Sequence, residues 1–274
     1  MSKKQNESHA LSFLYHNFFG RVILKLLTAR WVSKLCGAFL DTKLSKPLIK
    51  SFVSKNNIDL NDFESDNFTC FNDCFSRKIK DGKRSFPEDE SVFFSPCDAL
   101  LSAYHITDDT VVPIKQSAYT LESLLKDRVL AKDYKDGVCL VFRLCVNHYH
   151  RYCYPVSGLK GDNVFIKGKL HTVRPIALEN CPVFAENCRE YTVIDTDNFG
   201  KVLQMEVGAM LVGKIKNHHQ SGYVKRTKEK GMFLYGGSTI VVLLQKDKVH
   251  INEIFFKNTE NFIETDVVMG QPLN

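Results

Sequence analysis

The 274-residue sequence lacks the long apolar run, about 20 residues, that a membrane-spanning helix requires. Its longest stretch without a charged residue covers only residues 231–245 and includes Gly236 and Gly237. The first ten residues, MSKKQNESHA, contain no apolar segment followed by a small-residue cleavage site. We therefore expect neither a transmembrane span nor a secretory signal in this sequence.

Sequence motifs of several common enzyme classes are also missing. There is no GxGxxG fingerprint of dinucleotide-binding folds, no P-loop and no HExxH zinc motif. The nine cysteines are an odd number, and Cys70 and Cys74 have no second pair at the spacing of a zinc site. We expect reduced thiols and no bound metal.

The positive charge is confined to the N-terminal fifth of the chain. Residues 1–55 hold ten Lys or Arg and two acidic residues, a net charge of +8, whereas residues 56–274 hold 27 and 29, a net charge of −2. An even basic surface would favour a nucleic-acid partner. A basic segment that is also rich in Leu and Phe favours an anionic membrane surface, so we expect a membrane partner and no nucleic acid.

Residues 11–40 have a helical pattern that one straight amphipathic helix does not satisfy. At 100° per residue, the apolar face of residues 11–27 continues into Arg30 and Lys34. Two helical pieces with a break near residues 28–30 remove this conflict. The pieces are expected either to lie in a membrane interface or to pack on the body of the protein. Residues 47–54 predict a further helix.

From residue 91 onward, short Val-, Ile-, Phe- and Tyr-rich runs alternate with Gly, Asp and Asn, which predicts a mostly antiparallel β domain. One short helix is expected at 121–126. The fold class is therefore α+β: a helical, basic, membrane-associating region at 1–85 and a β-rich domain at 86–274. The expected strands are 111–114, 138–146, 164–166, 191–194, 202–207, 209–215, 240–244 and 249–256.

Three short stretches supply an acid, an imidazole and a hydroxyl, in Asp98, His150 and Ser238. Each alone has an ordinary structural reading: a turn or cap residue, a hydrogen-bonded core histidine and a tight turn. Together they form a set that can activate a serine, because the carboxylate orients the imidazole and the imidazole removes the hydroxyl proton. The preceding Gly236-Gly237 permits the unusual backbone geometry of a reactive peptide bond.

At these positions the chain resembles the phosphatidylserine decarboxylase family. Gly237-Ser238-Thr239 matches the family's self-cleavage motif. Six further similarities precede it, and they occur along this chain in the same order as in the family. They are Cys70–Lys78, Ser95-Pro-Cys-Asp98-Ala, Tyr149-His150-Arg151-Tyr-Cys153-Tyr-Pro155, Val173-Arg-Pro-Ile-Ala-Leu, Phe184-Ala-Glu-Asn-Cys-Arg and Val207-Gly-Ala-Met-Leu-Val-Gly.

The resemblance implies a proenzyme that cuts itself between Gly237 and Ser238. His150, with Asp98 behind it, deprotonates Ser238, whose oxygen attacks the carbonyl of Gly237; an acyl shift and elimination then leave a pyruvoyl group. The products are a β chain, 1–237, and an α chain, 238–274. The pyruvoyl ketone forms a Schiff base with phosphatidylserine and releases CO₂ to give phosphatidylethanolamine. After processing, His150 is the candidate proton donor. No metal and no pyridoxal phosphate are implied.

The resemblance also implies a homodimer bound peripherally to the cytoplasmic face of the membrane. Three departures from the family's motifs concern substrate choice and decarboxylation: Ala99 replaces Gly, His148 replaces an Asp, and Cys153 replaces the second His of the His-x-x-His motif. His148, Tyr149 and Cys153 are candidate substrate-binding residues. Two alternatives remain open: a pyruvoyl-dependent decarboxylase of a free amino acid, and an uncleaved, non-catalytic membrane-binding relative.

Overall fold

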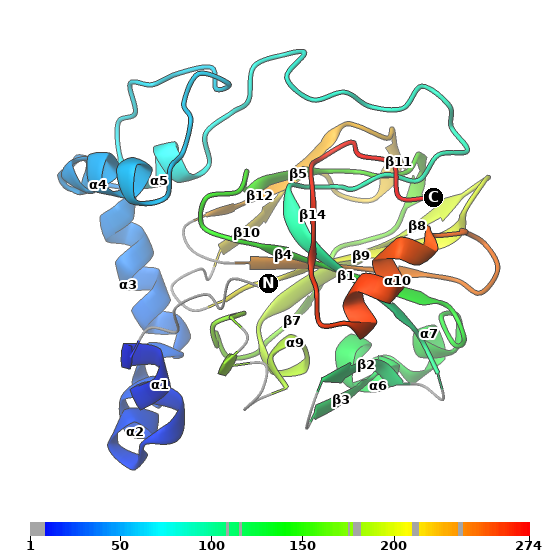
Figure 1. Ribbon diagram of the computed structural model, residues 1–274, viewed down its shortest axis with the longest axis horizontal. Helices are drawn as coiled ribbons and strands as arrows, with labels where there is room; N and C mark the ends of the chain where they lie inside the picture. The colour runs from blue at the N-terminus through cyan, green and yellow to red at the C-terminus, as the bar shows by residue number, and fades with distance from the viewer. Residues whose placement is uncertain are drawn as a thin grey trace.

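The computed structural model describes residues 9–107, 110–114, 117–174, 176–177, 182–209, 214–234 and 238–274 (Figure 1). The helices are α1 (His9–His16), α2 (Phe18–Leu27), α3 (Arg30–Leu40), the 3₁₀ turn η1 (Lys43–Ser45), α4 (Pro47–Lys55), α5 (Phe71–Phe75), α6 (Leu121–Leu125), α7 (Arg128–Lys132), α9 (Val183–Glu186) and α10 (Glu253–Glu260). The strands are β1 (Ala99–His105), β2 (Thr110–Ile114), β3 (Ser117–Thr120), β4 (Val138–Leu144), β5 (Arg151–Cys153), β6 (Gly158–Lys160), β7 (Val164–Ile166), β8 (Arg189–Thr196), β9 (Gly200–Val207), β10 (Lys214–Asn217), β11 (Gly222–Val224), β12 (Glu229–Leu234), β13 (Ser238–Leu244) and β14 (Thr265–Val267).

Two stacked sheets form the body of the protein. The larger sheet has the strand order β11-β6-β8-β9-β13-β4-β1-β14, with β7 also paired to β8. The smaller sheet has the order β10-β12-β5, and β2 and β3 form a separate hairpin. All pairings recorded between these strands are antiparallel. The predicted α+β fold, with helices first and an antiparallel β region after them, is confirmed.

Strand β13 lies at the centre of the larger sheet and is buried on both faces, which explains its uninterrupted apolar sequence. Val241 and Leu243 belong to a core layer that also contains side chains of α6, α7 and α9. Ile240 and Val242 face the opposite layer, which is closed by Phe233 of the smaller sheet and by side chains of α10. The whole larger sheet therefore depends on cover from both sides.

The N-terminal helices lie along one side of the β body (Figure 1). The predicted break is confirmed: α2 ends at Leu27 and α3 begins at Arg30. A second break precedes α2, where the side chain of Asn17 accepts a hydrogen bond from the Phe19 amide at 2.9 Å. Buried Tyr15 and Leu24 join the core of the body, and the Leu170 amide donates to the Thr28 carbonyl at 3.2 Å.

The opposite face of these helices is apolar and exposed. Phe18 and Phe19 of α2 are 76% and 72% exposed. Trp31, Leu35 and Phe39 of α3 stand at i, i+4 and i+8, so they form one exposed stripe. One face of the N-terminal helices therefore packs on the β body, which was one of the two expected arrangements. A second apolar face of the same helices remains exposed. Within the described part of the chain, no helix has the length and apolar character needed to cross a bilayer.

Two of the expected strands need comment. The prediction of a strand at 249–256 is wrong, because α10 begins at Glu253. The side chain of Asn252 accepts a hydrogen bond from the Ile254 amide at 3.0 Å and caps the helix, while adjacent Phe255 and Phe256 are buried. The expected strand at 209–215 falls mostly on residues 210–213, outside the described residues, and β10 begins at Lys214.

Replacing the cap of α10 is expected to destabilise the protein modestly. Asn252→Ala removes the acceptor for the Ile254 amide and should lower the free energy of unfolding by about 1 kcal/mol. Asn252→Asp keeps an acceptor and places a negative charge at the helix N-terminus, so it should retain the wild-type value. Urea unfolding followed by circular dichroism measures both. Equal midpoints for the Ala and Asp variants would contradict this account of α10.

Candidate active site

Ser238 is the first residue of β13 and is completely buried. Its Oγ makes no hydrogen bond to any described residue. It pairs with Leu144 of β4, and its side chain lies on the same face as Ile240, towards the smaller sheet. A buried hydroxyl without a partner is energetically unfavourable, so its retention here points to a chemical role. Gly237, the other residue of the predicted cleavage site, lies outside the described residues.

Asp98 lies at the same edge of the larger sheet as Ser238. It immediately precedes β1, and both β1 and β13 are antiparallel to β4, which lies between them. Arg143 of β4 pairs with Leu100 on one side and with Thr239 on the other. Since neighbouring strands are about 4.8 Å apart, the starts of β1 and β13 are separated by about 10 Å.

His150 reaches this edge through the turn that follows β4. The turn is closed by the His148 amide, which donates to the Cys145 carbonyl at 3.0 Å, and by the Cys145 amide, which donates to His148 Nδ1 at 3.1 Å. The carbonyl of His150 accepts a hydrogen bond from the Phe233 amide at 2.9 Å. His150 itself is completely buried and packs against the ring of Phe75, with 4.0 Å between ring centroids.

The tautomer of His150 follows from its hydrogen bond to the backbone. Nδ1 lies 2.9 Å from the carbonyl oxygen of His148, which can only accept, so Nδ1 carries the proton. In the neutral ring, Nε2 then holds the lone pair and is the basic nitrogen. This is the tautomer that removal of a hydroxyl proton by Nε2 requires. The orienting group described here is a backbone carbonyl, which sequence reasoning missed.

Asp98 has partners that the sequence prediction did not name. Arg84 donates from Nε to Asp98 Oδ1 at 3.1 Å and forms an ion pair through Nη2 with Oδ2. The Met269 amide donates to Oδ1 at 2.8 Å. Both side chains of the ion pair are largely buried. The predicted support of His150 by Asp98 stays a prediction, whereas the position of Asp98 is held by Arg84 and Met269.

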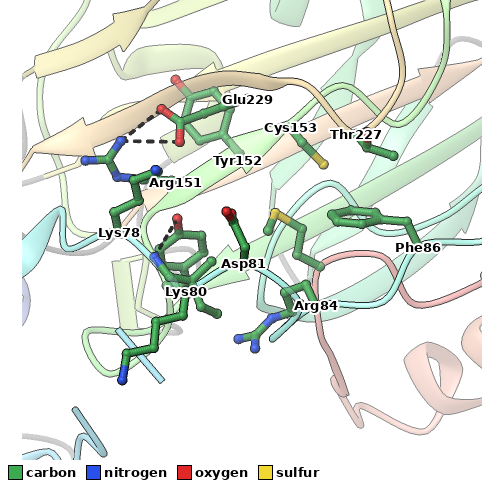
Figure 2. Close-up of a pocket in the computed structure, with 14 residues that line it drawn as sticks. Lys78, Lys80, Asp81, Arg84, Phe86, Arg151, Tyr152, Cys153, Thr227 and Glu229 are labelled. Carbon is green, nitrogen blue, oxygen red and sulfur yellow. Dashed lines mark hydrogen bonds and ion pairs between the residues drawn. The ribbon is translucent and has the colours of Figure 1, made fainter. Parts of the chain in front are cut away.

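A cavity of about 200 Å³ adjoins Asp98 through Arg84, which is one of the residues that line it (Figure 2). Tyr149 and Cys153, two of the three candidate substrate-binding residues, line it as well, but His148 does not. Basic side chains from the 78–84 loop and from β5 surround it, and Arg151 is paired with Glu229 at 3.0 Å. The sequence signal for this wall is the basic run from Lys80 to Arg84.

Burial keeps several of these side chains uncharged. Desolvation lowers the pKa of His148 below its usual value, so this imidazole is neutral at pH 7. Burial raises the pKa of Tyr149 to about 12 and also raises the pKa of the Cys153 thiol. Cys153 Sγ donates to the Pro96 carbonyl at 3.5 Å and packs with Phe94 and Tyr149. Cys153 is therefore a protonated packing residue at neutral pH.

No group of three or more His, Cys, Asp or Glu side chains suited to a metal ion is found in the described ranges. The candidate site comprises a buried serine, a histidine in a defined tautomer and an arginine-bound aspartate at one sheet edge. Such a set provides a nucleophile and a base for acyl transfer.

The sequence profile of the phosphatidylserine decarboxylase family matches residues 71–273. This chain belongs to the phosphatidylserine decarboxylase family. It is 44% identical to phosphatidylserine decarboxylase proenzyme 2 of Clostridium acetobutylicum, covering 99% of this chain and 93% of that protein. It is 40% identical to the phosphatidylserine decarboxylase proenzyme of Ruminiclostridium cellulolyticum, covering 96% and 90%, and 37% identical to that of Fusobacterium nucleatum, covering 96% and 89%.

The family assignment from the sequence motifs is thus confirmed, and the protein is a member of a family of decarboxylases. Phosphatidylserine decarboxylase relatives match the N-terminal helices as well as the β body, since the alignments cover nearly the whole chain. The roles of Asp98, His150, Ser238, His148, Tyr149 and Cys153 in this chain of the phosphatidylserine decarboxylase family stay predictions.

The state of Cys153 can be measured directly in the native protein. Because burial raises the pKa of its thiol, Cys153 should react with N-ethylmaleimide at neutral pH at least about tenfold more slowly than the partly exposed Cys36 and Cys70. Peptide mass spectrometry after timed labelling measures each site, and a urea-unfolded sample controls for intrinsic reactivity. Labelling of native Cys153 as fast as Cys36 would contradict the packing role.

Proposed function

We propose that this protein is a phosphatidylserine decarboxylase proenzyme that cuts itself between Gly237 and Ser238 and carries a pyruvoyl group derived from Ser238. One observation carries the proposal: Ser238 Oγ is buried without a hydrogen-bond partner in the described structure, at the sheet edge that His150 also reaches. The relatives named as proenzymes support it. The proposed role of Asp98 is to fix this edge together with Arg84.

The self-cleavage step uses only groups of this chain and one water molecule. His150 Nε2 accepts the proton of Ser238, and Oγ forms a bond to the carbonyl carbon of Gly237 as the bond to the Ser238 nitrogen breaks; the proton held by His150 then passes to this nitrogen. This acyl shift gives an ester with a free amine. The neutral His150 next removes the Cα proton of Ser238 as the Gly237 carboxylate leaves Cβ, and the resulting dehydroalanine tautomerises to an imine, which water hydrolyses to the ketone and ammonia. The lone pair that the His148 carbonyl leaves on Nε2 suits this proton transfer.

A ketone formed at Ser238 fits the site, because the β13 terminus lies in an enclosed layer between the two sheets. The pyruvoyl group supplies the electron-withdrawing carbonyl for decarboxylation of an amine-bearing substrate. In this proposal His150 then returns a proton to the product carbon. Tyr149 and the basic side chains around the adjoining cavity contact the headgroup, and Cys153 contributes to the shape of the cavity. Neutral His148 holds in place its own backbone carbonyl, which orients His150.

The N-terminal helices are the proposed membrane contact. Their outer face is apolar and uncovered, and the segment around it carries a net charge of +8 over residues 1–55. Such a surface binds an interface that contains anionic lipid, and phosphatidylserine is itself anionic. Peripheral attachment to the cytoplasmic membrane face as a homodimer, without a nucleic-acid partner, completes the proposal.

A Ser238→Ala variant tests the proposal most directly. The wild-type protein should separate under denaturing conditions into fragments 1–237 and 238–274, and the smaller fragment should be blocked at its N-terminus. Ser238→Ala, which lacks the nucleophile, should remain a single chain and lose essentially all CO₂ release. Intact-mass spectrometry and a parallel assay with phosphatidylserine vesicles and free amino acids measure both. An uncut wild-type chain would refute the self-cleaving enzyme, and CO₂ release from a free amino acid alone would refute the lipid substrate.

Charged substitutions on the outer helix face should detach the protein from membranes. Phe19→Asp with Leu26→Asp should weaken binding to phosphatidylserine-containing vesicles by about tenfold or more, because each apolar side chain contributes about 1.5–3 kcal/mol when buried. Val129→Asp on α7 changes an apolar residue that is at least as exposed but lies away from the N-terminal helices, and it should bind as wild type. Vesicle co-sedimentation measures binding, and self-cleavage should proceed normally in all variants. Undiminished binding of the double variant would contradict this membrane surface.

A further inference from the structure

A completely buried ion pair lies between the two sheets. Lys230 of β12 donates from Nζ to Oε1 and Oε2 of Glu206 of β9, at 2.6 and 2.5 Å, and neither side chain is exposed to solvent. Burial alone raises the pKa of Glu206 and lowers the pKa of Lys230, so each charge depends on the other. Replacing a buried ion pair by well-packed apolar residues is often neutral or favourable for stability, so stability alone does not account for this pair.

The pair belongs to a hydrogen-bonded network that joins both sheets. Asn217 of β10 donates from Nδ2 to Glu206 at 3.0 Å and to Glu190 of β8 at 2.7 Å. Its Oδ1 accepts from the hydroxyl of Tyr152 of β5 at 3.1 Å. The network therefore connects every strand of the smaller sheet to β8 and β9 of the larger one. Such directional contacts specify how the sheets stack, which apolar contacts do less sharply.

The two residues of the pair also lie close to the predicted cleavage site, one on the strand before it and the other opposite the strand after it. Lys230 lies four residues before Leu234, where β12 ends, and Glu206 pairs across the sheet with Ile240, two residues after Ser238. Only three residues separate Leu234 from Ser238. A chain advances at most about 3.3–3.6 Å per residue, and stacked sheets lie about 10 Å apart. The distance between β12 and the larger sheet therefore restricts how the scissile peptide can approach Ser238 Oγ.

We propose that Glu206 and Lys230 are positioning residues for self-cleavage: their ion pair holds β12 at the distance and register from β9 that place the peptide before Ser238 for attack. This inference rests on the proposed self-cleavage of the chain. Neither residue touches the reacting atoms in this account. A change in β12 alters the approach of the peptide, whereas the His148 carbonyl that fixes the tautomer of His150 lies outside β12.

The test compares a neutral pair with the wild type. Glu206→Gln combined with Lys230→Met keeps the side-chain volumes and removes both charges together, so no unpaired charge remains. Lys230→Arg keeps the ion pair. Lys160→Met is the control, because Lys160 of β6 is also buried and influences the same carboxylate electrostatically, but among the described residues it donates to the Gly161 and Gln220 carbonyls and not to Glu206. Precursors made by pulse-labelled cell-free synthesis are followed by gel electrophoresis over a range of pH.

The neutral pair should fold, with a circular dichroism spectrum like the wild type, and should cut itself at least about tenfold more slowly at every pH. The molecules that have been cut should release CO₂ from phosphatidylserine within about twofold of the wild-type rate per pyruvoyl group. In these molecules the scissile peptide bond is already broken and no longer needs to be positioned. Lys230→Arg should recover most of the cleavage rate, and Lys160→Met should cut normally.

Two results would overturn the inference while leaving self-cleavage itself established. One is a folded neutral pair that cuts itself at the wild-type rate. The other is a neutral pair that fails to fold, or that loses activity per pyruvoyl group as strongly as cleavage, since both indicate a general structural role. A wild-type precursor that is never cut would instead refute the proposed function, and this inference with it.

Discussion

The stacking of the three-stranded sheet on the nine-stranded sheet is the constraint on which the rest of the structure depends. Without this cover, the face of β13 that carries Ile240 and Val242 would keep only the part of its packing that α10 and the adjoining loops supply. The same stacking encloses Ser238 and brings β5, with His150 just before it, over the edge where β1 and β13 begin. The hydrophobic core and the candidate site are therefore consequences of one packing arrangement.

Different segments of the chain fix the tautomer of His150 and the ion pair of Asp98. The turn after β4 fixes the tautomer of His150 through the His148 carbonyl, and the 78–84 loop supplies the arginine that binds Asp98. Membership of the phosphatidylserine decarboxylase family gives this arrangement a chemical context. The exposed apolar face of α2 and α3 lies outside the body, so the proposed lipid contact and the proposed chemistry at the sheet edge belong to different parts of the molecule.

Local sequence patterns predicted what depends on neighbours in the chain. The apolar run at 240–244 predicts β13, and the Gly-Ser-Thr motif identifies Ser238. The position of Arg30 on the continued apolar face of the preceding helix predicts the helix break. The alternation of Val249 and Ile251 with polar residues was misleading, because the cap at Asn252 decides the following element.

Contacts between distant residues left no readable local pattern. Asp98 binds Arg84, which lies 14 residues earlier in a loop. The His148 carbonyl orients His150 because the turn after β4 places this carbonyl next to the His150 ring. Lys230 follows Lys228 and Glu229 in a run of charges typical of solvent exposure, and no local pattern shows that it lies buried opposite Glu206 of the other sheet. Sequence reasoning, which weighs residues one segment at a time, cannot recognise such mutual dependence.

The central position of β13 has a consequence for how the protein would unfold. Residues 238–274 contain this strand, α10 and β14, and β13 is hydrogen-bonded to β4 on one side and β9 on the other. A chain cut before Ser238 would keep this 37-residue piece in place through these strand pairings and the core packing, with no covalent link. Once unfolded, the two pieces would separate, and reassembly would become a bimolecular reaction that depends on protein concentration. The native state of the cut molecule would then persist through slow unfolding rather than through reversible equilibrium.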